Sequence, residues 1–136
     1  MDDPREVLRR QERALNAHDV DALADCFHEN LLSENFVHPS QTFTGRDQVK
    51  RNWAQMIGDV PDLRAQLLGT ATDGDTVWGE WRIYGTRRDG ELLDLRGVVI
   101  SKVEDGRVRS SRRYLAPLDP GLETVDDFFR RMVEPR

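Results

Sequence analysis

Three Asp-Gly dipeptides punctuate the second half of this chain at regular intervals. They stand at Asp73-Gly74, Asp89-Gly90 and Asp105-Gly106, each sixteen residues from the next. Asp-Gly between β-favouring residues is the strongest short-range signal for a hairpin turn. The spacing therefore predicts an antiparallel meander of four long strands. The expected strands span residues 63–72, 76–86, 92–104 and 107–115.

The first half of the chain carries helix signals instead. Asp3 as an N-cap followed by Pro4 predicts a helix that ends near Ala17. Asp19 can cap a second helix, whose apolar residues recur at helical spacing until about Asn30. The meander is therefore preceded by helices that need a surface to pack against.

A short extended segment and a third helix connect this helical part to the meander. Residues 34–38 are expected to be extended, and Pro39 stops them. Gly45 marks the start of the third helix and Gly58 its end. We expect the apolar stripe of this helix to face inward. Its members are Val49, Trp53, Met56 and Ile57.

The segment at about residues 123–133 is predicted to form a last helix. Thr124 and Asp127 make a variant of the capping box. An apolar stripe follows, formed by Val125, Phe128, Phe129, Met132 and Val133. A stripe with two phenylalanines is not left in water. Two placements stay open: the helix covers the open end of its own sheet, or it packs on a second subunit.

Composition narrows the class of protein and its surroundings. The 136 residues suit a single domain, 1–136, with a core at about residues 5–117. The net charge of −5, with acidic and basic residues interleaved, favours neither nucleic acid nor a membrane as a partner. Cys26 is the single cysteine and the amino terminus is charged, so we expect a soluble, cytoplasmic setting.

A set of short motifs follows the predicted order of helix, helix, short strand, helix and meander. The motifs are Leu15–Asp19, Phe36–Pro39, Gly45, Gly79–Thr86 and Asp105–Val108. Together they resemble the nuclear transport factor 2-like superfamily, and within it the SnoaL-like branch, over about residues 5–117. The resemblance implies an α+β fold: a cone-shaped α+β barrel whose strongly curved, mixed or antiparallel sheet wraps around N-terminal helices. Members include ketosteroid isomerases, polyketide cyclases and binding modules, so the fold alone selects no function.

The resemblance points to His38 as a candidate general base. His38 ends the short strand, where ketosteroid isomerases carry their catalytic aspartate. An imidazole can accept a proton near neutral pH if one ring nitrogen is free. The alternative is a strand-end histidine that bonds to the backbone and does no chemistry. Geometry decides between the two.

Other catalytic groups of the family are missing from this chain. Counting from the Asp105-Gly106 turn places Val99 where isomerases carry a protonated aspartic acid, and Gln11 replaces their tyrosine. Arg113 stands where polyketide cyclases carry an aspartate, and a guanidinium stays protonated. Ala116 replaces a further common aspartate. Steroid isomerisation by the family mechanism is therefore not expected.

The residues expected around a pocket are mostly apolar. Besides His38 they are Phe36, Trp53, Trp81, Ile83, Val99, Arg113 and Leu115. Such a lining is typical of a small-molecule site, although core packing alone would also explain the aromatic residues. Strand alternation leaves open whether Arg112 or Arg113 faces inward. An inward Arg113 should meet Glu34, Glu80 or an anionic group of a ligand.

The opposite face of the second meander strand mixes aromatic and charged residues. Trp78, Glu80, Arg82 and Tyr84 share this face by the two-residue period of a strand. The mixture favours an interface, so we expect a homodimer through the sheet face. The three histidines show no metal-ligand spacing, and no phosphate-binding glycine loop is present, so neither a metal nor a cofactor is expected.

Two classes of function stay open. The first is a cofactor-free enzyme of cyclase, isomerase or hydratase type acting on a polyketide- or terpenoid-like substrate. His38 would be its base, and Arg113 would stabilise an enolate or carboxylate. The second is a non-catalytic binding module or dimeric interaction module of the same fold. In both, the expected ligand is a small apolar or weakly acidic molecule.

Overall fold

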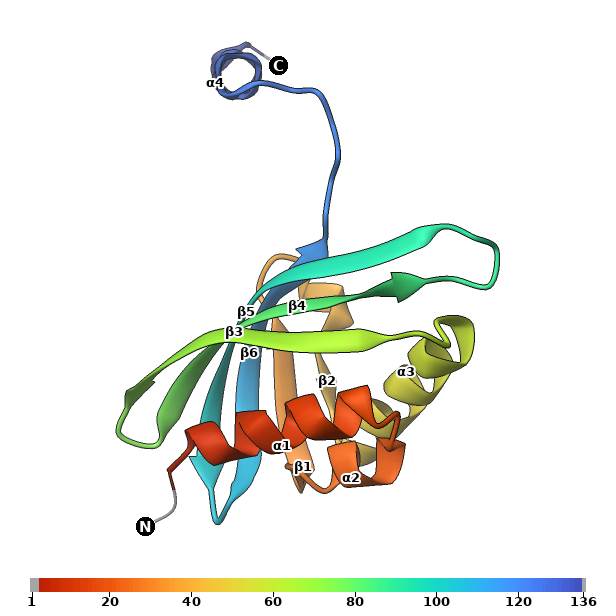
Figure 1. The fold of residues 1–136 in the computed structure, drawn as a ribbon. Helices are drawn as coiled ribbons and strands as arrows, with labels where there is room; N and C mark the ends of the chain where they lie inside the picture. Colours follow the sequence, from red (N-terminus) through yellow and green to blue (C-terminus); the bar gives the residue numbers. More distant parts are fainter. Residues whose placement is uncertain (1–2, 136) are drawn as a thin grey trace.

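The computed structural model describes residues 3–135 and shows an α+β fold built on a six-stranded mixed sheet (Figure 1). The strands lie in the order β2-β1-β6-β5-β4-β3. The helices are α1 (Arg5–Asn16), α2 (Val20–Ala24), α3 (Arg46–Asp59) and α4 (Val125–Val133), with a short 3-10 helix η1 (Pro39–Gln41). The strands are β1 (Phe27–Asn35), β2 (Phe43–Thr44), β3 (Arg64–Asp73), β4 (Thr76–Thr86), β5 (Leu92–Glu104) and β6 (Arg107–Pro117).

The predicted meander is confirmed. Strands β3 to β6 pair antiparallel in chain order, and each differs from its predicted bounds by at most two residues. The glycine of each Asp-Gly turn has a positive φ: 60° at Gly74, 91° at Gly90 and 73° at Gly106. Glycine adopts this conformation without a steric penalty, which is why the dipeptide marks the turns. The sheet is curved but does not close, because β2 and β3 are its two free edges.

Among the glycines, Gly97 of β5 leaves the least room for a side chain. Its φ is 150°, and a Cβ built on it would lie 1.9 Å from the carbonyl oxygen of Tyr114 on β6. Only glycine allows the two backbones to approach this closely. Gly97 pairs with Trp81 on one side and with Leu115 on the other, so it lies in the middle of the meander.

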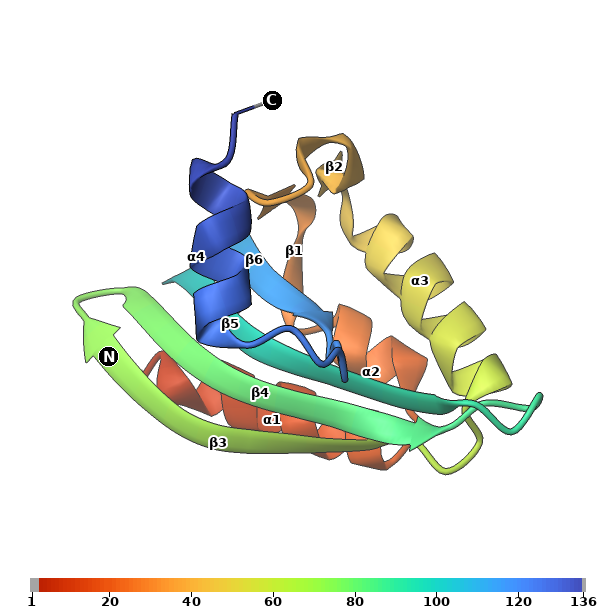
Figure 2. The ribbon, with the colours of Figure 1, turned by 90° about the horizontal axis from the view of Figure 1, so that it is seen from above.

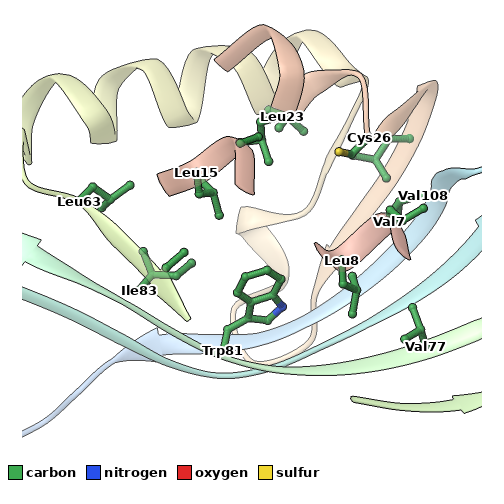
Figure 3. Packing of buried hydrophobic residues seen from close by; sticks show 14 of the residues in the cluster. Val7, Leu8, Leu15, Leu23, Cys26, Leu63, Val77, Trp81, Ile83 and Val108 are labelled. Carbon is green, nitrogen blue, oxygen red and sulfur yellow. The ribbon is translucent and has the colours of Figure 1, made fainter. Parts of the chain in front are cut away.

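Helices α1 and α2 lie against one face of the sheet, and α3 flanks them (Figures 1 and 2). We call this helix-covered face the inner face and the other the outer face. The core lies between the helices and the inner face, with Trp81 at its centre (Figure 3). Leu8 of α1 and Leu31 of β1 are fully buried there. Each such leucine contributes roughly 1.5–3 kcal/mol by its removal from water.

Helix α1 also protects the free edge strand β3. The Asn16 side chain bonds to both backbone groups of Ala65: its Nδ2 donates to the Ala65 carbonyl at 3.0 Å, and its Oδ1 accepts from the Ala65 N–H at 2.8 Å. Glu12 Oε2 accepts from the Leu67 N–H at 2.6 Å. These side chains satisfy backbone groups that an unpaired edge would expose, so another strand cannot add there.

The prediction for residues 19–38 is wrong in two places. The second helix ends at Ala24 instead of continuing to Asn30, and β1 begins at Phe27. The extended segment also ends earlier than expected, at Asn35 and not at His38. Strand β1 pairs in parallel with β6, more than 70 residues away in the chain. This non-local pairing overrides the helical spacing of the apolar residues.

The outer face carries the mixture of aromatic and charged side chains that the sequence predicts. In β4, Val77, Gly79, Trp81 and Ile83 are buried while the intervening residues point outward. Asp94 of β5 binds two arginines on this face. Its oxygens accept from Arg96 at 3.0 and 3.1 Å and from Arg82 at 3.3 and 3.4 Å. These bonds, Arg96 first, lower the pKa of Asp94 to about 2.

Replacement of Asp94 with asparagine should make stability less dependent on pH. A folded-state pKa of about 2, below the unfolded value of about 3.9, means that the carboxylate stabilises the fold above about pH 4. This contribution is lost as the pH falls toward 2. We expect the difference in urea midpoint between wild type and Asp94→Asn to be largest at pH 7 and to shrink between pH 4 and 3. If the difference in urea midpoint between wild type and Asp94→Asn is the same at pH 7 and at pH 3, the low pKa of Asp94 is contradicted.

The C-terminal helix forms as predicted. Thr124 and Asp127 make the capping box, with the Asp127 N–H bonded to Thr124 Oγ1 at 3.2 Å and the Thr124 N–H to Asp127 Oδ2 at 3.2 Å. The helix stands clear of the domain, on the side of the sheet opposite α1 (Figures 1 and 2). All nine of its residues are exposed. It therefore does not cover its own cavity. None of the helices within residues 3–135 is long and apolar enough to cross a membrane.

Candidate functional site

A cavity of about 100 Å³ lies between the inner face of the sheet and helices α1, α2 and α3. Its wall is mostly apolar, with contributions from β1, β2, β4, β5 and β6. Six of the eight residues expected around a pocket lie on this wall. They are Trp53, Trp81, Ile83, Val99, Arg113 and Leu115. The structure thus brings together residues from α3 and three strands of the meander.

Phe36 and His38 do not lie on this wall. Phe36 is 47% exposed and stacks on Tyr114, with ring centroids 5.8 Å apart. His38 is exposed in the loop before η1, and its N–H donates to Asn35 Oδ1 at 2.9 Å. The alternation of β1 explains the position of Phe36, since Leu31, Ser33 and Asn35 are the buried residues, whereas His38 lies beyond the end of the strand. Even-numbered residues therefore point away from the cavity, and this geometry brings no imidazole to it.

Three serines form a polar row on the wall that the sequence prediction missed. Ser33 of β1 pairs with Ser111 of β6, which pairs with Ser101 of β5. All three are buried, and the Ser111 hydroxyl donates to Ser33 Oγ at 3.1 Å. The two-residue alternation was a usable signal, because Ser101 follows Val99 and Ser111 precedes Arg113 by two positions.

Arg113 is the charged side chain of the cavity wall, and the open choice between it and Arg112 is resolved in its favour. Its Nε donates to Ser33 Oγ at 2.8 Å and its Nη2 to the Gln41 carbonyl at 2.7 Å. The guanidinium also lies 5.1 Å from the centre of the Phe43 ring. Arg112 points to the other side, over the Phe36 ring.

The partners of Arg113 are neutral. No carboxylate within residues 3–135 makes an ion pair with it, so the expected contact with Glu34 or Glu80 is absent there. Glu34 pairs in register with Arg112, and Glu80 points to the outer face. Partial burial lowers the pKa of Arg113, but a guanidinium remains charged. The cavity therefore holds a positive charge that hydrogen bonds orient and that no carboxylate of residues 3–135 neutralises.

The wall has no evident group for proton transfer. Among the residues that line the cavity, none carries a carboxyl, imidazole, thiol or phenol group. Gln11 of α1 is 8% exposed and supplies an amide to the wall. Within the described part of the chain, no group of three or more His, Cys, Asp or Glu side chains could hold a metal ion. The arrangement is suited to binding an oxyanion beside an apolar body.

Comparison with known proteins adds one curated relative. Over 74 residues the chain is 28% identical to "Probable cyclase otaY" of Aspergillus niger. The matched stretch covers 49% of this chain and 62% of that protein. The match thus spans less than two thirds of the relative's length.

Solved structures share the fold at low sequence identity. IdmH of Streptomyces antibioticus, a candidate polyketide cyclase, has a TM-score of 0.70 at 18% identity and covers 85% of this chain and 92% of that chain. RV0760c of Mycobacterium tuberculosis, in complex with estradiol-17beta-hemisuccinate, has a TM-score of 0.70 at 17% identity, with 83% and 94% covered. A Catenulispora acidiphila protein with a ketosteroid isomerase-like fold, in complex with trimethylamine, has a TM-score of 0.69 at 16% identity, with 80% and 84% covered.

The family comparison extends over most of the chain. Residues 8–111 match the SnoaL-like domain, from the first helix to the middle of the last strand. This stretch contains Ser33, Trp81 and Ser101 of the cavity wall, whereas α4 lies outside it. The chain belongs to the SnoaL-like domain family.

Proposed function

We propose that this protein binds a small, largely apolar molecule in the cavity through a carboxylate or enolate oxygen held by Arg113. One observation carries the proposal: the Arg113 guanidinium faces an apolar cavity and contacts neutral oxygens from Ser33 and Gln41. An anionic ligand would supply the missing opposite charge in a site from which water is partly excluded. Charge-assisted bonds of this kind are roughly twice as strong as neutral ones.

The cavity also limits the size of the ligand. Its volume of about 100 Å³ is well below the roughly 300–1,000 Å³ of sites for drug-sized molecules. A single ring or a short branched chain fits this space, whereas a polyketide- or terpenoid-like molecule would insert only one end. Trp53 and Leu115 would contact the apolar part of the ligand.

A reaction of cyclase or isomerase type fits this site if Arg113 stabilises the developing oxyanion. Cyclisation and isomerisation of carbonyl compounds both pass through an enolate, whose oxygen needs a preorganised positive partner. No lining residue is suited to accept the proton, so solvent or the substrate would take it. The relative named as a cyclase supports this reaction class for the present chain.

Binding without catalysis is the second candidate. The same lack of a carboxyl or imidazole group on the wall favours it, since acid/base catalysis contributes roughly 10²–10⁴-fold to such reactions. The two candidates make the same prediction for binding and opposite predictions for turnover.

A matched pair of probes tests the binding proposal. Benzoate and benzamide have nearly the same shape and differ in charge, so benzoate should bind more tightly in calorimetry at low salt. His38→Ala should leave the affinity for benzoate unchanged because His38 lies outside the cavity. Equal affinity for the two probes would contradict an anion site. A lower affinity for benzoate in His38→Ala would mean that His38 belongs to the site.

An exchange experiment separates the two candidate functions. 2-Oxobutyrate carries a carboxylate and an enolisable carbon, and NMR in deuterium oxide reports exchange at that carbon. Exchange faster than in buffer supports the enzyme. Binding of 2-oxobutyrate without faster exchange supports the binding module.

For assembly, we propose a homodimer through the outer face of the sheet. Tyr114 is 41% exposed and Phe36 47% exposed on this face. Aromatic side chains are enriched at the centre of an interface, and polar and charged residues surround them at its rim.

A further inference from the structure

Helix α4 and the outer face of the sheet present two apolar surfaces that the single chain leaves uncovered. The stripe of α4 comprises Val125, Phe128, Phe129, Met132 and Val133, which are between 41% and 79% exposed. A nine-residue helix is marginal in water on its own, because helices shorter than about 12–15 residues rarely persist without packing. The stripe therefore needs a partner surface.

The outer face offers such a surface, which we call the outer patch: Phe36, Trp78, Val98, Ile100 and Tyr114. These residues are neighbours, since Trp78 pairs with Ile100 and Val98 with Tyr114 across the strands, while Phe36 stacks on Tyr114. Trp78 and Val98 also line a shallow groove over β3 and β4, whose other wall is formed by small residues at positions 69–72. A groove of this kind accepts an amphipathic helix.

The linker directs α4 away from the patch of its own chain. The Leu118 N–H donates to the Asp94 carbonyl at 2.7 Å, which fixes the first residues of the linker near the start of β5. Pro120 and a turn in which the Gly121 N–H bonds to Asp119 Oδ1 follow. Figures 1 and 2 show α4 on the outer side of the sheet but separated from it. This separation leaves the outer patch open to another copy.

Charge and area both fit a second copy of the chain. Arg131 lies beside Phe128 on α4, where it pairs with Glu123 at 3.0 Å, and its charge is opposite to that of Glu80 in the groove. A fully buried aromatic side chain removes about 150–250 Å² from water, so each half-exposed phenylalanine adds on the order of 100 Å². Each stripe has two phenylalanines and three smaller apolar side chains, so the two stripes and the surfaces that they cover reach the roughly 1,200–2,000 Å² of a stable interface.

We propose that α4 of one copy packs its apolar stripe on the outer patch of a second copy, and that the exchange is reciprocal. This contact rests on the homodimer proposed above, which supplies the second copy, and α4 is the element that forms the interface. A two-fold axis satisfies both stripes and both patches at once, which gives a closed dimer.

Substitutions on either surface test the contact by sedimentation equilibrium. Phe128→Glu with Phe129→Glu on α4, or Ile100→Glu in the patch, should weaken the dimer roughly tenfold or more, since buried aromatic residues dominate interfaces. Arg130→Glu is the matched control for the helix: it changes the net charge by the same −2 but lies on the polar side of α4. It should leave the dimer intact. Far-UV circular dichroism and benzoate binding verify that each variant is folded.

Mixing the two defective variants tests reciprocity. The helix variant keeps an intact patch and the patch variant keeps an intact helix, so the mixture should form a heterodimer with one good contact. It should associate more tightly than either variant alone.

A wild-type monomer would overturn both this proposal and the homodimer. A dimer that survives the helix substitutions would overturn the α4 contact and leave sheet-to-sheet pairing. Failure of the mixture to associate would overturn the exchange.

Discussion

Replacement of Gly97 with alanine is expected to destabilise the domain by about 4 kcal/mol or more, which is exceptional for one methyl group. The added Cβ would lie 1.9 Å from the Tyr114 carbonyl oxygen and 2.9 Å from the Leu115 Cα. Both are backbone atoms, so no side chain can rotate to make room. The φ of 150° adds strain for any residue with a Cβ. Strands β5 and β6 would have to separate where the sheet bends around the cavity.

Urea denaturation of Gly97→Ala measures this loss, and Gly69→Ala is its control. Gly69 lies in the exposed edge strand β3, and a Cβ there meets no atom within 4 Å. The control should differ from wild type by less than about 1 kcal/mol. If the two variants have the same urea midpoint, the close approach of β5 and β6 is not as the structure shows.

Replacement of Arg113 with glutamine is expected to weaken benzoate binding up to roughly a hundredfold, since a bond to a charged group contributes about 1.5–3 kcal/mol. Stability should change little, because the guanidinium is half-buried among neutral partners and its removal leaves no carboxylate unpaired. Arg113→Lys should recover only part of the affinity, since a lysine cannot contact Ser33, Gln41 and a ligand with one planar group.

Arg112→Gln is the matched control for the binding measurement. It removes the same charge one residue away, but Arg112 lies on the outer face over Phe36. Benzoate affinity should therefore stay at the wild-type value. Equal losses in Arg112→Gln and Arg113→Gln would mean that benzoate responds to net charge alone and would contradict the proposed site.

The meander could be predicted closely because its signals are local. Each Asp-Gly turn carries its own conformational preference, and the strand lengths follow from the spacing. Counting from the Asp105-Gly106 turn placed Val99 and Arg113, and both lie on the cavity wall. The capping box of α4 is likewise a local signal, and both of its bonds are present.

The first strand could not be predicted in the same way because it depends on a distant partner. Phe27 and Asn30 fit a helical pattern, but they form a strand because β6 offers parallel pairing. The prediction also placed Phe36 and His38 facing the pocket. Strand alternation directs Phe36, the residue after β1, to the outer side, and His38 lies farther on in the loop before η1. His38 was predicted as the base from the family resemblance, through its place before Pro39, whereas the serine row went unnoticed.

Two of the three tryptophans lie at the cavity, and the third lies in the outer patch. Trp53 and Trp81 line the cavity, whereas Trp78 belongs to the outer patch. Indole fluorescence responds to the polarity around the ring, so the chain carries its own optical probes for two separate events. Emission from Trp53→Phe/Trp81→Phe would report the arrival of a second copy. Emission from Trp78→Phe would report the filling of the cavity, without any attached label.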